Sequence, residues 1–163
     1  MENNTNLAGY LRMMTDIIEK KKNCLQSILE ATQDQERILK SEDFDDDEFS
    51  ALIDIKAKNI DKVNELDDGF QTVYDKIKAE IGEKKAEHEG QIKALQKLVS
   101  EVTELGVQIT ALEKQNRNTL ENVKNAAMRN TKNFKVSRNT ASNYYKTMAG
   151  LHGAGPSFMD EKQ

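Results

Sequence analysis

The sequence has few of the residues that build compact globular cores, disulfide frameworks or metal centres. It contains no Trp, one Pro, 6% aromatic residues and a single cysteine, Cys24, among 163 residues. One cysteine excludes an internal disulfide and a cysteine-based zinc site within one chain, because structural zinc needs about four clustered ligands. No apolar run approaches the roughly 18 residues that cross a bilayer, and the first residues lack the basic start and apolar core of a secretory signal. We therefore expect a soluble protein of the reducing cytoplasm.

Charge is distributed unevenly along the chain. Charged residues make up 32% of the sequence, and the formal net charge is −4. Residues 1–121 carry 17 basic and 26 acidic residues, whereas residues 122–159 carry six basic residues and no Asp or Glu. This contrast predicts an acidic body followed by a cationic tail.

Apolar residues recur at three- and four-residue spacing in three stripes, a pattern typical of long amphipathic helices. The stripes predict helices at about 5–40, 46–81 and 87–128. The acidic residues 41–48 separate the first two stripes, and their side chains are suited to capping a helix start. Residues 82–90 lack an apolar stripe and predict a reversal, with one continuous helix of twice the length as the alternative. The resulting fold is all-α, an elongated antiparallel three-helix bundle of coiled-coil type over residues 1–125 with a flexible, partly helical C-terminal tail.

Polar residues interrupt the first stripe. Lys21, Thr32 and Gln35 stand where the repeat would bury an apolar side chain. We expect an imperfect seam that loosens toward the end of this helix. Gly69 is the one position inside the second helix where we expect a locally weakened helix, because glycine has a flexible backbone.

The tail, residues 126–163, is basic and rich in Asn, Thr, Ser and Gly. Its composition predicts a largely disordered partner-binding segment with one short helix near residues 140–148. Tyr and Met suit docking on a partner's groove, because they offer large or adaptable contact area. The alternative is that this short helix folds back on its own bundle as ordinary core. The candidate partner-binding residues are the apolar ones of this segment: Tyr144, Tyr145, Met148, Leu151, Phe134, Val136, Phe158 and Met159.

The basic residues of the same tail could also contact phosphates, as in a nucleic-acid or membrane-surface segment. Six charges over 38 residues are sparse, and the attached body is acidic. We therefore expect neither nucleic-acid binding nor membrane insertion.

One acidic segment has part of the spacing of a calcium-binding loop. Asp43, Asp45 and Asp47 match ligand positions one, three and five, and Asp54 stands at position twelve. The sixth position holds Glu48 in place of the Gly that makes the sharp turn, and Asp54 is shorter than the usual Glu. The pattern favours an acidic helix start over a metal site.

No arrangement of residues nominates a catalytic centre. His88 and His152 are far apart in the sequence, and neither has a neighbouring nucleophile. Cys24 lies beside the first apolar stripe, which favours a half-buried small hydrophobe over a reactive thiol. Phosphate-binding loops and hydrolase motifs are missing from the sequence. We expect a protein that is no enzyme and needs no cofactor or metal.

Four stretches resemble the flagellar export chaperones of the FlgN-like family. Residues 35–40 and the acidic residues after them resemble the end of the family's first helix and the short polar turn that follows it. Leu52 and Lys56 have the leucine-then-lysine spacing with which the family's second helix begins. Glu113 and Asn116, after the segment 105–109, resemble its Glu-x-x-Asn signature. The more specific likeness is in the tail, at residues 142–148 and 158–160. The resemblance extends from about residue 7 to residue 159.

The resemblance implies a cytoplasmic chaperone for flagellar type III export. Such a protein binds the hook-associated proteins of the hook–filament junction, prevents their premature assembly and delivers them to the export gate and its ATPase complex without consuming ATP itself. It implies a monomer or a weak homodimer, and it leaves open which hook-associated protein is the cargo. The alternative is a structural coiled-coil adaptor unrelated to secretion, which should remain a tight oligomer on dilution.

Overall fold

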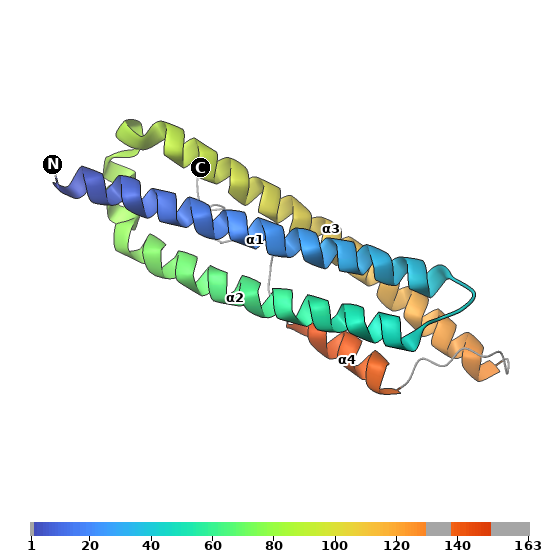
Figure 1. Cartoon of the computed structure of the whole chain (residues 1–163). Helices are drawn as coiled ribbons and strands as arrows, with labels where there is room; N and C mark the ends of the chain where they lie inside the picture. The colour runs from blue at the N-terminus through green and yellow to red at the C-terminus, as the bar shows by residue number, and fades with distance from the viewer. Residues whose placement is uncertain (1, 130–137, 151–163) are drawn as a thin grey trace.

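The computed structural model describes residues 2–129 and 138–150, and their regular structure is helical throughout. The helices are α1 (Glu2–Lys40), α2 (Asp46–Glu83), the short 3₁₀ helix η1 (Lys85–His88), α3 (Glu89–Arg129) and α4 (Arg138–Ala149). Figure 1 shows the three long helices side by side in an elongated bundle, with α2 running opposite to α1 and α3. The all-α bundle predicted from the apolar stripes is confirmed.

The acidic segment between the first two helices begins α2. The Asp45 carboxylate accepts a hydrogen bond from the backbone N–H of Glu48 at 3.0 Å, which caps the helix. Three acidic residues occupy the first turn, where they complement the positive end of the helix dipole. The aspartates that resembled a calcium loop therefore include the N-cap of a helix.

The reversal between α2 and α3 takes place at residues 84–88. The backbone N–H of Lys84 closes the last turn of α2 by donating to the carbonyl of Glu80 at 2.9 Å. The 3₁₀ helix η1 that follows has no buried residue. A helix without an apolar face gains nothing by continuing along the bundle. The alternative of one continuous helix is therefore excluded.

The helix α1 is the centre of the packing. It contacts α2 and α3 along its length, whereas close backbone contacts between α2 and α3 are few. One side of the bundle, between α2 and α3, therefore has no long helix over it. No helix within residues 2–129 and 138–150 has the length and apolar character needed to cross a membrane. The fully buried apolar residues that α1 contributes to the core are Leu7, Leu11, Met14, Ile18, Leu25 and Ile28.

The polar residues in the first stripe do not loosen the seam. Lys21, Thr32 and Gln35 are fully buried, and α1 stays packed as far as Leu39. The Lys21 ammonium lies 2.6 Å from the Asp67 carboxylate on α2. The expected loosening is wrong because each of these side chains has a polar partner on a neighbouring helix, which offsets part of the cost of its burial.

Candidate functional site

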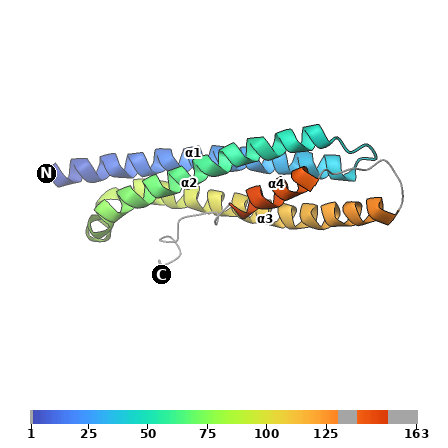
Figure 2. The same ribbon diagram turned by 90° about the horizontal axis from the view of Figure 1, so that it is seen from below.

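The short helix α4 covers part of the side between α2 and α3. Figure 2 shows it lying between these two helices, near the end of the bundle where α1 connects to α2. The Thr140 hydroxyl donates to the Asp46 carboxylate at 3.0 Å. At the other end of α4, the Asn64 side-chain amide donates to the carbonyl of Gly150 at 3.3 Å. The order of these contacts shows that α4 runs parallel to α2.

The Tyr144 ring forms part of a second apolar cluster at this end of the bundle. Its centroid lies 5.6 Å from that of Phe49 and 5.7 Å from that of Tyr145. Phe44 extends the group, with its centroid 5.2 Å from that of Phe49. Tilted and edge-on ring pairs at such distances add stabilisation beyond the area that they bury. The buried members of the cluster are Ile38, Leu39, Phe49, Ile53, Leu120 and Tyr144.

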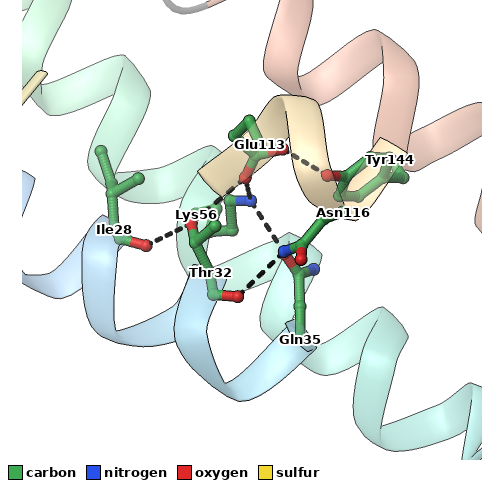
Figure 3. Close-up of polar contacts among 7 residues, drawn as sticks. All are labelled: Ile28, Thr32, Gln35, Lys56, Glu113, Asn116 and Tyr144. Carbon is green, nitrogen blue, oxygen red and sulfur yellow. Dashed lines mark hydrogen bonds and ion pairs between the residues drawn. The ribbon is translucent and has the colours of Figure 1, made fainter. Parts of the chain in front are cut away.

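A buried polar network joins all four α-helices beneath α4 (Figure 3). The Tyr144 hydroxyl donates to one carboxylate oxygen of Glu113, on α3, and the other oxygen accepts from the Lys56 ammonium of α2. The Lys56 ammonium also donates to the side-chain carbonyl of Gln35, on α1, at 2.8 Å. Lys56 is fully buried, and the Glu113 side chain is 12% exposed. A buried charge needs such partners, because desolvation without them costs several kcal/mol.

Two further residues fix how α1 and α3 are aligned at the network. The Asn116 side-chain amide donates to the backbone carbonyl of Thr32 at 3.0 Å. The Thr32 hydroxyl lies 2.6 Å from the carbonyl of Ile28 and 3.2 Å from Glu113. Sliding α3 along α1 by one turn would leave these polar groups buried and unpaired, so the network stabilises one register.

Burial determines the protonation chemistry of the site. Desolvation lowers the pKa of Lys56, and the neighbouring Glu113 carboxylate opposes that shift. Burial raises the pKa of Tyr144 well above its ordinary value, and the Glu113 charge raises it further. Tyr144 is therefore a neutral hydrogen-bond donor at physiological pH.

Two cations face the consecutive tyrosines of α4. The Lys56 ammonium lies 5.2 Å from the Tyr144 ring centroid, and the Arg117 guanidinium lies 5.1 Å from the Tyr145 ring centroid. Both distances are within the range of cation–π attraction. The site thus holds Tyr144 through one carboxylate acceptor and one cation, and it holds Tyr145 through a second cation.

The structure brings together three of the predicted partner-binding residues. Tyr144 is 2% exposed, and Tyr145 and Met148 are half-buried against the clusters beneath α4. The short helix therefore does have apolar surface to bury against, in contrast to a free tail. This apolar surface lies on the side of the bundle between α2 and α3, which no long helix covers. The apolar stripes of the separate helices do not reveal that side. The remaining candidates, Phe134, Val136, Leu151, Phe158 and Met159, lie outside the described residues.

Sequence reasoning did not identify the polar residues that hold α4. These residues are Lys56, Glu113 and Asn116, which the sequence indicates only through the family resemblance. The available signal was their position, because Lys56 and Asn116 are buried where the repeat calls for an apolar side chain. A charged residue at such a position predicts a partner across the bundle.

Comparison with protein families supports this placement. The family model described as FlgN protein matches residues 12–150, which include most of α1, all of α2, α3 and α4, and the whole polar network. The chain belongs to the FlgN family. This is a family of flagellar export chaperones and not of enzymes, so membership implies a chaperone role for the chain. No curated protein and no solved structure matches this FlgN-family chain.

Proposed function

We propose that this FlgN-family chain is a cytoplasmic chaperone for hook-associated proteins. It binds these proteins of the hook–filament junction, keeps them from assembling early and delivers them to the export gate and its ATPase complex. The observation that supports the proposal is the family match, which extends through α4 to residue 150. The match therefore includes the segment that carries the aromatic anchors.

The proposed grip on cargo is formed by Tyr144, Tyr145 and Met148. Tyr145 and Met148 are partly exposed while α4 is docked, so a cargo helix can pack on them directly. Tyr144 is buried, so it reaches cargo only when α4 leaves the bundle. Amphipathic helices commonly bind apolar surfaces of this kind through anchors one turn apart. Leu151, Phe134 and Val136 are proposed to add contact area, and Phe158 and Met159 are proposed as further partner-binding residues.

Binding of this type is expected to be reversible. Cargo that reaches Tyr144 must first displace α4 from the bundle, and this cost offsets part of the gain from contacts. Delivery requires release, so moderate affinity suits the role. We also propose a monomer or weak homodimer. Sedimentation on dilution tests this, because a structural adaptor would persist as a tight oligomer.

The test of the function is co-purification with each hook-associated protein in turn. The full chain is compared with a Tyr145→Ala, Met148→Ala variant, which changes α4 but leaves Tyr144 in the core. Tyr10→Ala is the matched control, because Tyr10 is also half-buried but lies on α1 and outside α4. Far-UV circular dichroism checks that each variant remains helical.

Three outcomes are distinguishable. Loss of cargo by the α4 variant alone supports the chaperone function with α4 as its grip. Equal binding by all three chains supports the chaperone function and places the cargo site elsewhere. Failure of the unaltered chain to retain any hook-associated protein overturns the proposal.

A further inference from the structure

We propose that α4 is a displaceable internal occupant of a docking groove, and that this groove receives an amphipathic helix of a partner that presents a tyrosine. The groove, here called the tyrosine groove, is the surface of α2 and α3 beneath α4. It combines apolar residues with a carboxylate and two cations. Its residues are Phe49, Ile53, Lys56, Ile60, Glu113 and Arg117.

The polar floor of the tyrosine groove is assembled without α4. Lys56 is held by Gln35 from α1 and Glu113 from α3, and Asn116 bonds to the backbone of Thr32. These contacts join the three long helices to one another. The floor is therefore positioned by the bundle. Among the described contacts, α4 adds to it one hydrogen bond, from the Tyr144 hydroxyl, and the contact of the Tyr144 ring with Lys56. Such a preformed site can accept a second helix without rebuilding the core.

The hold of α4 on the bundle is small compared with that of the long helices. It has 12 residues, and an isolated helix of this length is marginal in water. Of its described side chains, Thr140, Ala141 and Tyr144 are buried. The long helices each bury a stripe that runs most of their length. Segments with few buried contacts open at lower free energy than the rest of a fold, so α4 is the element that leaves first.

The chemistry of the groove defines the helix that it accepts. The Glu113 carboxylate accepts from a hydroxyl, and it would repel a phosphorylated or carboxylate side chain. Ala141 lies one turn before Tyr144, and Met148 lies one turn after it on the same side. A partner helix with a small residue, a tyrosine three positions later and an unbranched apolar residue four positions after that would make the same contacts. Entry of the partner helix would displace α4 and free Tyr144 and Met148 of this chain. That these two residues then bind export cargo rests on the proposed function.

The test uses a fluorescent peptide with the sequence of residues 138–150 as the partner helix. It is titrated against the full chain with Asp46→Cys and Thr140→Cys in a Cys24→Ser background. The Asp46 and Thr140 side chains touch, so oxidation is designed to tie α4 to α2. The oxidised and reduced states share one sequence, and mass spectrometry and circular dichroism verify the bond and the helical fold.

A second chain, with Tyr144→Ala alone, removes the anchor of the internal helix and leaves the groove intact. The tethered α4 competes at a high effective concentration, so weakening it should tighten binding of the added peptide. We expect the Tyr144→Ala chain to bind at least about tenfold more tightly than the unaltered chain, the effect of one hydrogen bond to a charged group. The reduced double-cysteine chain should bind the peptide, and the oxidised chain should not. A peptide with Phe in place of Tyr144 should bind about tenfold more weakly.

The proposal is overturned if the Tyr144→Ala chain does not bind the peptide, or if locking α4 leaves binding unchanged. Equal binding of the Tyr and Phe peptides would overturn the assignment of Glu113 as the recognising group. No flagellar protein takes part in this experiment. Failure of peptide binding with retention of a hook-associated protein would therefore reject the tyrosine groove and leave the chaperone function standing.

Discussion

Glu113→Ala removes the only carboxylate that pairs with Lys56 in the described contacts. The Lys56 ammonium is fully buried, and without Glu113 it would retain the Gln35 carbonyl as its hydrogen-bond acceptor. Breaking a buried ion pair from one side costs about 3–5 kcal/mol, because an uncompensated charge remains in the core. The Tyr144 hydroxyl loses its acceptor in the same variant, which adds to the destabilisation. We expect a loss of about 4 kcal/mol, a large part of the 5–15 kcal/mol that ordinarily stabilises a domain.

The assay is urea unfolding followed by circular dichroism at 222 nm, with a comparison of midpoints and slopes. Glu101→Ala is the matched control, because Glu101 is also a carboxylate of α3 that pairs with a lysine of another helix. It lies 2.7 Å from Lys22 on α1, but both side chains are about one-third exposed. Its loss should have a much smaller effect, because water screens an exposed ion pair. Adding Lys56→Met to Glu113→Ala removes the stranded charge and should recover most of the lost stability.

The reasoning is refuted if Glu113→Ala and Glu101→Ala have similar small effects. Lys56 would then be reaching water in solution, and the network would not hold the helices as described. A double variant that is no more stable than Glu113→Ala alone would show that the cost comes from Tyr144 and α4. The contribution of the unpaired Lys56 charge to the loss of stability would then be small.

Three further predictions concern single residues. Burial raises the pKa of Tyr144, so its contribution to stability is complete below about pH 10, the value of an unperturbed tyrosine, and is lost as pH rises above that value. Hydrogen exchange of α4 at increasing pH should detect this loss of stability, and Tyr144→Phe should abolish it. Burial lowers the pKa of Lys56, so Lys56 contributes a change of stability with pH of the opposite sign in both chains. Asp45→Ala removes the cap of α2 and should cost about 1 kcal/mol, seen as a melting temperature lower by roughly 2–4 °C, whereas an unchanged melting temperature would count against the cap. Gly69→Ala should stabilise the chain by about 0.5–1 kcal/mol, because an added Cβ meets Ile17 at 3.9 Å without a clash, and a loss of stability in urea would contradict this.

Much of the fold could be predicted from the sequence because the apolar period is local. Phe49, Ile53, Ile60 and Val63 are spaced by four, seven and three residues, which keeps them on one helix face, and the structure buries all of them on one side of α2. The acidic cap and the charged reversal interrupt the period, and the helices end there. Interactions within a few residues decide each of these features, so one sequence contains the information.

The candidate site was less predictable because its residues meet across the bundle. The spacing of Tyr144, Tyr145 and Met148 predicts an amphipathic helix, and α4 has that form. The same spacing suits a helix docked on a partner and a helix docked on its own chain. Whether these residues bind cargo remains a proposal, and the structure shows where α4 lies in the free chain.

The sequence by itself determined that the chain forms long helices and where they are interrupted, because periodicity and capping act between neighbouring residues. Only the tertiary structure decided where α4 lies and which polar side chains meet beneath it. Glu113 is 57 positions from Lys56 and 31 from Tyr144. Their contact depends on how far α2 and α3 separate as both pack on α1. That separation is set by the combined packing of all three long helices, which no local pattern encodes.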